Sequence, residues 1–169
     1  MRKILVYLTV ILLFTMQSHG QQKNDNIKFH SVDLGLGLFF NNNFGGLALH
    51  SSIACKQQNN LYSITAITGG EFVILGGRSA SYQELNLQYG KQLQLAKWFV
   101  LEGFVGVGYY NQNSTKANIS DGSSISLPFK INTKFKFNKH FGMGFMNNYS
   151  ISKLNNNFTA NILFHYNFN

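Results

Sequence analysis

The sequence predicts an all-β fold in which eight antiparallel strands run up and down and close into a barrel. Three observations support this prediction. Segments along most of the chain alternate apolar and polar residues with a period of two, as a strand with one apolar face does. Clusters of Gly, Asn and Ser separate these segments, and none of the segments has convincing helical spacing. Only 12% of the residues are charged, against about 25% in an ordinary soluble domain.

Residues 1–20 are predicted to be a cleaved signal peptide rather than part of the fold. Residues 1–3 give a positive start, residues 4–15 form an almost unbroken apolar run, and residues 18–20 offer small side chains at a cleavage site. The run of about a dozen residues is too short for a membrane-spanning helix, which needs roughly twenty. We therefore expect residues 21–169 to form the mature barrel domain.

The N-terminal half of that domain supplies four predicted strands. The third segment, about residues 61–68, is clearly a strand, but the pattern does not show which of its two faces is the apolar one. Either Tyr62 and Ile64 or Leu61 and Ile67 could lead its apolar side. The apolar positions of the other three strands are Val32, Leu34, Leu36 and Leu38; Leu47, Leu49 and Ile53, with Ser51 on the same face; and Leu85, Leu87 and Tyr89.

The C-terminal half supplies four more strands and the clearest pattern. From Ile125 to Phe137 the alternation is near-strict, and a helix would scatter both sets of residues around its circumference. We expect strands of about nine to thirteen residues. The apolar positions of the remaining three are Leu101, Val105, Val107 and Tyr109; Phe141, Met143, Phe145 and Tyr149; and Phe158, Ala160, Ile162, Phe164, Tyr166 and Phe168.

The connectors between these strands differ in length. Two of those that follow an odd-numbered strand are long, whereas those that follow an even-numbered strand are shorter on average. This asymmetry is typical of an outer-membrane barrel, which has long loops at one end and short turns at the other. The predicted connectors are residues 41–46, 57–60, 69–81, 90–97, 111–124, 138–140 and 153–157.

Composition indicates that the apolar face contacts lipid. A polar face in bulk water should carry about 25–35% charge, whereas Gly and Ser dominate several polar faces here. Small residues suit a narrow lumen, where side chains from opposite walls compete for space. Apolar faces also end in aromatic residues such as Tyr109, Phe137 and Phe168, as interfacial girdles do. The predicted fold is therefore an eight-stranded antiparallel up-and-down transmembrane β-barrel.

These features resemble the small Gram-negative outer-membrane β-barrel proteins, of the OmpA/OmpX-like eight-stranded kind. The resemblance covers the whole mature chain. It rests on the signal, the number of strands, the segment Ile125-Ser-Leu-Pro-Phe-Lys130 that opens the long amphipathic strand, and the terminal Phe164-His-Tyr-Asn-Phe168. Such a terminal strand is similar to the signal read by the outer-membrane assembly machinery, although Asn169 rather than an aromatic residue comes last.

The resemblance implies an integral protein of the cell outer membrane that contacts outer-membrane lipids and lipopolysaccharide. We expect a monomer that is assembled through its C-terminal strand. The chain carries a net charge of +8 at pH 7, which could indicate nucleic acid or an anionic lipid surface. Because the basic residues are dispersed and the protein is exported, no nucleic-acid partner is predicted.

Charged residues of both signs are expected inside the barrel. Buried charges need partners, so Glu102 and Lys134 should be cross-strand neighbours. A balanced set of charges predicts a closed, packed polar lumen, whereas a ring of one sign would be more typical of an ion-selective pore. The six side chains are Asp33, Glu84, Glu102, Lys130, Lys134 and Lys136.

A lipid-modifying hydrolase is the first alternative. His50 and Ser52 share one strand face, and Glu84 could orient the imidazole, as a nucleophile, base and orienting group require. The spacing is similar to the His-x-Ser of outer-membrane lipid A deacylases, but Ile53 stands where that family has Asn. Both side chains should face the lumen, where acyl chains would not reach them. A soluble periplasmic ligand-binding barrel is the second alternative.

No catalytic, cofactor-binding or metal-binding residues are assigned, and no cofactor is expected. The histidines lack metal-ligand spacing, Cys55 is expected to be a free thiol, and the glycine run 103–108 lies inside a strand rather than before a helix. An extracellular partner, if there is one, would bind the loops, such as residues 111–124 or residues 69–81 with Arg78. The sequence therefore predicts a non-enzymatic role in envelope integrity or surface interaction.

The first prediction concerns closure of the barrel. We expect the detergent-extracted protein to migrate differently on a gel before and after boiling, because a closed barrel stays folded in cold detergent and unfolds only on heating. Recovery from the outer-membrane fraction should accompany the shift. A protein that shows no shift and is soluble without detergent would mean that the two faces are reversed.

Overall fold

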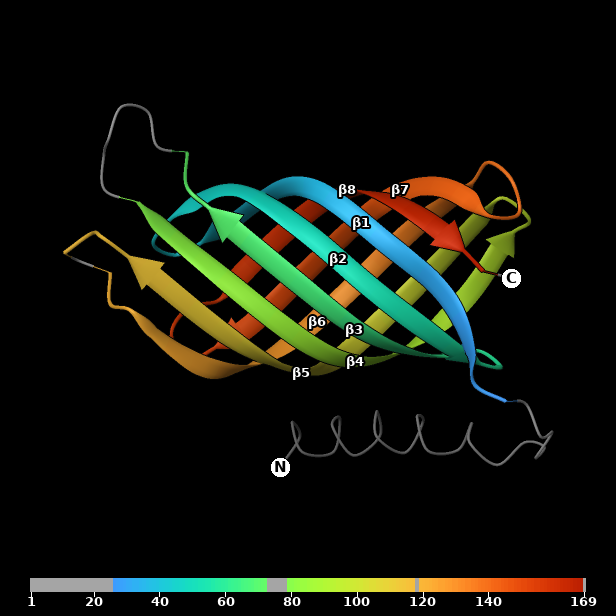
Figure 1. Ribbon diagram of the computed structural model, residues 1–169, viewed down its shortest axis with the longest axis horizontal. Coiled ribbons are helices and arrows are strands. Elements are labelled where there is room, and N and C mark those ends of the chain that lie inside the picture. The colour runs from blue at the N-terminus through green and yellow to red at the C-terminus, as the bar shows by residue number, and fades with distance from the viewer. Residues whose placement is uncertain (1–25, 73–78, 118, 169) are drawn as a thin grey trace, which may run out of the picture.

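A computed structural model of the protein describes residues 26–72, 79–117 and 119–168. The predicted signal peptide, Arg78 and Asn169 lie outside these residues. Eight strands form one closed barrel in which each strand pairs antiparallel with its neighbours in sequence, and β1 pairs with β8 (Figure 1). The strands are β1 (Lys28–Asn41), β2 (Gly45–Gln57), β3 (Asn60–Gly70), β4 (Ala80–Ala96), β5 (Phe99–Ser114), β6 (Gly122–Lys136), β7 (Phe141–Ser152) and β8 (Asn157–Asn167).

The predicted strand order is confirmed, but several strands are longer than expected. β4 has 17 residues and continues through most of the predicted connector 90–97, so that only Lys97 and Trp98 separate it from β5. Gly90 suggested a turn, yet it lies inside the barrel beneath Phe104. A Cβ atom added to Gly90 would approach a ring atom of Phe104 to 2.4 Å. The glycine therefore makes room for an aromatic ring and does not end the strand.

The connectors divide the barrel into two ends, as the alternation of their lengths predicts. Figure 1 shows the longer connectors at the end opposite the C-terminus. We call the end with residues 42–44, 71–72, 79, 115–117, 119–121 and 153–156 the loop end, and the end with residues 58–59, 97–98 and 137–140 the turn end.

The outer surface of the barrel is apolar on every strand. Leu36 on β1, Leu87 on β4 and Phe145 on β7 are each more than half exposed. The open question of β3 is resolved, because Ile64 is 57% exposed whereas Leu61 is fully buried. Among the described residues, no helix is long and apolar enough to cross a bilayer.

Aromatic rings form a belt around the turn end of this surface. Phe29 contacts Phe168 with 6.2 Å between ring centroids, which links β1 to the end of the chain. Trp98 stacks on Phe135 at 6.0 Å and an interplanar angle of 15°. Tyr and Trp with neighbouring Phe typically mark the level where a barrel leaves the hydrocarbon for the headgroups. The expected girdle is thus present at the turn end. Further contacts in this belt join Tyr62 to Tyr89, Phe99 to Phe135 and Phe141 to Tyr166.

Inside the barrel, glycines sit where neighbouring strands leave no space for a side chain. A Cβ atom on Gly37 would lie 1.9 Å from the carbonyl oxygen of Ala160, and one on Gly144 would lie 2.0 Å from that of Thr133. Both distances are far below van der Waals contact. The small residues of the polar faces therefore reflect a narrow lumen, as predicted from composition.

Candidate functional site: the closed lumen

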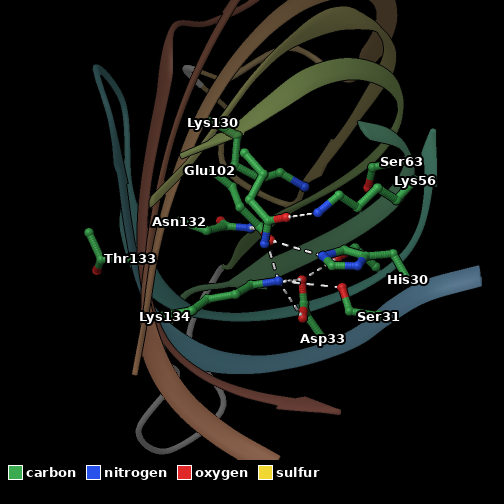
Figure 2. Close-up of polar contacts among 12 residues, drawn as sticks. His30, Ser31, Asp33, Lys56, Ser63, Glu102, Lys130, Asn132, Thr133 and Lys134 are labelled. Atoms are coloured by element: carbon green, nitrogen blue, oxygen red, sulfur yellow. Dashed lines mark hydrogen bonds and ion pairs between the residues drawn. The ribbon is translucent and has the colours of Figure 1, made fainter. Parts of the chain in front are cut away.

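A three-residue ion network fills the lumen near the turn end. The Nζ atom of Lys134 on β6 lies 2.9 Å from each carboxylate oxygen of Asp33 on β1 and 2.9 Å from Oε2 of Glu102 on β5. Figure 2 shows the three side chains converging from different strands, while Thr133 points away from them. All three are almost completely buried. One ammonium group thus connects three strands of the barrel, β1, β5 and β6.

Three further polar side chains surround the two carboxylates. Asn132 donates to Oε2 of Glu102 at 3.2 Å, and Ser52 donates to Oδ2 of Asp33 at 3.3 Å. Nε2 of His30 lies 3.6 Å from Oε1 of Glu102. Hydrogen bonds to ionised oxygens orient the carboxylates toward the lysine, which is the arrangement that lets buried charges persist.

The predicted contact between Glu102 and Lys134 is confirmed, but the two residues are diagonal neighbours and not a directly opposed pair. Glu102 lies directly opposite Asn132 in the β5–β6 ladder, so the lysine reaches it from two residues farther along β6. His30 was not predicted as a member. A register shift between Phe29 and Ser31 interrupts the alternation of β1 beside His30, which hides its inward facing from a period-two analysis.

Lys130 lies four residues before Lys134 on β6 and has no carboxylate partner among the described residues. Its ammonium donates to Oγ1 of Thr65 at 2.7 Å and lies 4.4 Å from the centroid of the Phe104 ring. Thr65 in turn donates to Gln88 at 2.9 Å. A hydroxyl and the negative face of an aromatic ring therefore stabilise this buried cation.

Two further predicted lumen charges, like Lys130, stand apart from the network. Glu84 accepts hydrogen bonds from Ser126 at 2.8 Å and from Ser150, and it has no ion pair among the described residues. Lys136 lies only partly buried at the last residue of β6. Glu84 is buried inside the barrel, as predicted, whereas Lys136 is only partly buried at the rim of the turn end and is not enclosed in the lumen. Among the described residues, neither forms an ion pair with the other predicted lumen charges.

An aromatic cluster closes the loop end. Phe39 contacts Tyr82 with 4.8 Å between ring centroids, and Tyr82 stacks on Tyr110 at 5.6 Å. The hydroxyl group of Tyr82 lies 3.0 Å from Oγ1 of Thr159 across the barrel. All three rings are fully buried. These three residues were not predicted as lumen residues, although their positions on the inward faces could have identified them.

The residues of the hydrolase alternative do not form a catalytic relay. Ser52 donates to Asp33 of the ion network, and neither ring nitrogen of His50 has a hydrogen-bond partner in the described part of the chain. Glu84 binds two serines on β6 and β7 instead of His50. A base without an orienting carboxylate and a serine bonded elsewhere lack the geometry that activates a nucleophile.

Metal and thiol chemistry have no assembled site within residues 26–72, 79–117 and 119–168. No group of three His, Cys, Asp or Glu side chains there could hold a metal ion. Cys55 is a free thiol, as predicted, and it is partly buried on β2.

No protein-family model matches the sequence, and no curated protein matches it. Several solved structures do match in fold. Ail, the attachment invasion locus protein of Yersinia pestis, is 12% identical with a TM-score of 0.60, covering 83% of this chain and 99% of Ail. Neisserial surface protein A is 9% identical with a TM-score of 0.62, covering 83% of this chain and 96% of that one. The N-terminal β-barrel domain of OprF from Pseudomonas aeruginosa is 9% identical with a TM-score of 0.55, covering 85% of this chain and all of that domain.

The chain has the fold of the small outer-membrane barrels. Its apolar belt faces outward and its charges face inward, which is the reverse of a soluble ligand-binding barrel with an apolar cavity. The protein is an integral barrel of the outer-membrane type, and the soluble alternative is not supported.

The ion network yields a prediction about stability. Replacing Lys134 with Met leaves Asp33 and Glu102 buried without their cation, which should lower the free energy of unfolding by about 3–5 kcal/mol. The measurement is denaturant unfolding of the protein in lipid vesicles, followed by the fluorescence of Trp98, the single tryptophan of the chain.

A matched control is available at the loop end. Lys116 lies 2.6 Å from Glu71 in a partly exposed pair, so Lys116→Met should cost about 1 kcal/mol or less. Adding Asp33→Asn and Glu102→Gln to Lys134→Met should recover most of the loss, because no unpaired charge then remains. Equal costs for the two single variants would contradict the role assigned to the network.

Proposed function

We propose that the protein is a non-enzymatic, closed outer-membrane barrel that supports the cell envelope or presents a surface for contact outside the cell. The observation that carries the proposal is that the lumen is filled at two separate levels. The Lys134 network occupies the turn end, and the aromatic cluster of Phe39, Tyr82 and Tyr110 occupies the loop end. A barrel of eight strands has an interior just wide enough for such side chains.

The charges of the network support a structural role more than conduction. The cation of Lys134 is bound by carboxylates on both sides and cannot form a ring of one sign. Ion-selective pores are commonly lined by rings of like charge and need sites weak enough for ions to leave. A tightly coordinated ammonium group satisfies neither condition.

The loop end supports a role in surface contact. The Glu71–Lys116 pair joins the connectors that follow β3 and β5. The backbone N–H of Thr115 donates to the carbonyl of Ser79 at 2.9 Å, and the N–H of Ser79 donates to the hydroxyl of Thr115 at 2.8 Å. Two connectors held together in this way form a preorganised surface, which reduces the entropy lost on binding.

The structural relatives are consistent with such a role. Ail is named the attachment invasion locus protein, and its structure was solved in complex with the heparin analogue sucrose octasulfate; a second similar structure is that of a Neisserial surface protein. The low identities mean that the likeness concerns the fold. This likeness supports a role in surface contact, but it does not indicate which ligand this chain would bind.

Closure of the lumen predicts the electrical behaviour of the protein. In planar bilayers the wild-type protein should give no discrete conductance steps, because the ion network and the aromatic cluster each block the lumen. A variant that removes both, with Tyr82→Ala, Tyr110→Ala, Glu102→Ala and Lys134→Ala, serves as the opened control. Resolved steps from the folded wild-type protein would contradict the proposal.

Complementation separates the functional alternatives. We expect a strain lacking the protein to become more sensitive to detergent, and His50→Ala/Ser52→Ala to restore resistance as well as wild type does. Failure of this variant despite a normal gel shift would favour an enzyme. The loosened loop variant Glu71→Gln/Lys116→Met should also restore resistance if the role is envelope integrity, and should fail if contact through the loop end is required.

A further inference from the structure

Exposed charge is distributed unequally between the two ends of the barrel. Lys28, Lys97 and Lys139 are exposed at the turn end, and Lys136 is partly exposed there. Among the described residues, the acidic side chains outside the lumen are Glu71 and Asp121, and both belong to the loop end. The turn end is therefore a basic rim without an exposed carboxylate in the described part of the chain.

Three of these lysines surround a groove between two turns. The groove has a volume of about 410 Å³ and separates the β4–β5 turn from the β6–β7 turn. None of the three forms an ion pair with any described residue. Because no acid lines the groove, their positive charge is available to a ligand. The lining residues are Lys97, Trp98, Lys136, Phe137, Asn138 and Lys139.

The walls of the groove are held in place by backbone contacts. The N–H of Lys136 donates to the carbonyl of Trp98 at 2.8 Å, which fixes one turn against the end of β6. The side-chain oxygen of Asn138 accepts from the N–H groups of His140 and Phe141 at 2.8 Å each, which closes the other turn. The groove is thus formed by two tight turns.

The groove lies at the level of the aromatic belt. Trp98 stacks on Phe135 in that belt and is 59% exposed, and Phe137 is 68% exposed. Aromatic residues of this kind mark the boundary between hydrocarbon and headgroups. A ligand in the groove would therefore have its charged part beside the ammonium groups and any acyl chains along the apolar belt below.

We propose that this groove binds the phosphate group of an anionic phospholipid in the leaflet that meets the turn end. The proposal rests on the proposed function, in which the loop end lies outside the cell, so that the short turns face the periplasm. The three lysines favour a negatively charged ligand. The adjoining apolar belt can contact acyl chains, which favours a lipid over a soluble phosphate. Each lysine near an anionic surface contributes an attraction equal to about a fivefold change in affinity.

The single tryptophan provides a direct test, since Trp98 itself lines the groove. The wild-type protein is reconstituted in vesicles of equal phosphatidylglycerol and phosphatidylcholine. In one set only the phosphatidylglycerol carries brominated chains, and in the other only the phosphatidylcholine does. The surface charge is the same in both sets, so unequal quenching of Trp98 reports which lipid occupies the groove. We expect a preference of at least about fivefold for phosphatidylglycerol, which is the effect of a single lysine beside the phosphate.

Matched variants locate the preference. Lys97→Ala/Lys136→Ala/Lys139→Ala should reduce it to about one, whereas replacing all three with Arg should retain it because the charge is kept. The loop-end variant Lys116→Ala/Lys153→Ala should behave as wild type. The gel shift on heating verifies that each variant is folded, and silence in planar bilayers tests the closed barrel independently of lipid binding.

Three outcomes would overturn the proposal. Equal quenching in the two sets of wild-type vesicles would show that the groove does not select the anionic lipid. A preference that survives the triple Ala variant would place the selectivity elsewhere. If glycerol phosphate shifts the emission of the micelle-bound protein and abolishes the preference in vesicles, the groove is a site for soluble phosphate, and the assignment to lipid is wrong.

Discussion

The width of an eight-stranded barrel is the constraint on which the rest of this structure depends. An interior just wide enough for side chains requires each inward position to fit its opposite wall. Gly37 and Gly144 leave space where strand backbones approach, and Phe39, Tyr82 and Tyr110 fill the loop end. The same narrowness brings Lys134 within reach of acids on two other strands, so a single ammonium group can join β1, β5 and β6.

The fold was predictable from sequence because apolar, outward-facing residues alternate with polar, inward-facing residues along each strand. Alternation alone assigned the outward residues of seven strands. Both faces of β3 carry apolar side chains, so only the burial of its residues in the structure shows which of them face outward. Strand ends were less predictable. Gly90 has the character of a turn residue, but only the packing of Phe104 explains why a strand passes through it.

The composition of the lumen was predictable, and so was the Glu102–Lys134 pair, but most of the other contacts were not. The sequence indicates that Glu102 and Lys134 face the interior, yet the diagonal contact depends on the strand tilt and register. Glu84 faces inward as predicted, but its partners are the serines on β6 and β7. His30 was missed because a local irregularity in β1 breaks the period on which the analysis relies. The period-two alternation therefore identifies which residues face the lumen, whereas strand register and tilt determine which of them are in contact.

The pairing of β1 with β8 has a consequence for how the chain acquires its structure. This ladder joins Ser31 to Asn167 and Leu36 to Ile162, so the seam closes only when nearly the whole sequence is in place. Until then the first and last strands each expose a row of unpaired N–H and C=O groups, which the hydrocarbon of a membrane does not tolerate. Loop closure over such a separation also carries an entropy cost that local hairpins avoid. Hairpins can form early, but stable residence in lipid should come in one cooperative step when the two ends of the chain meet.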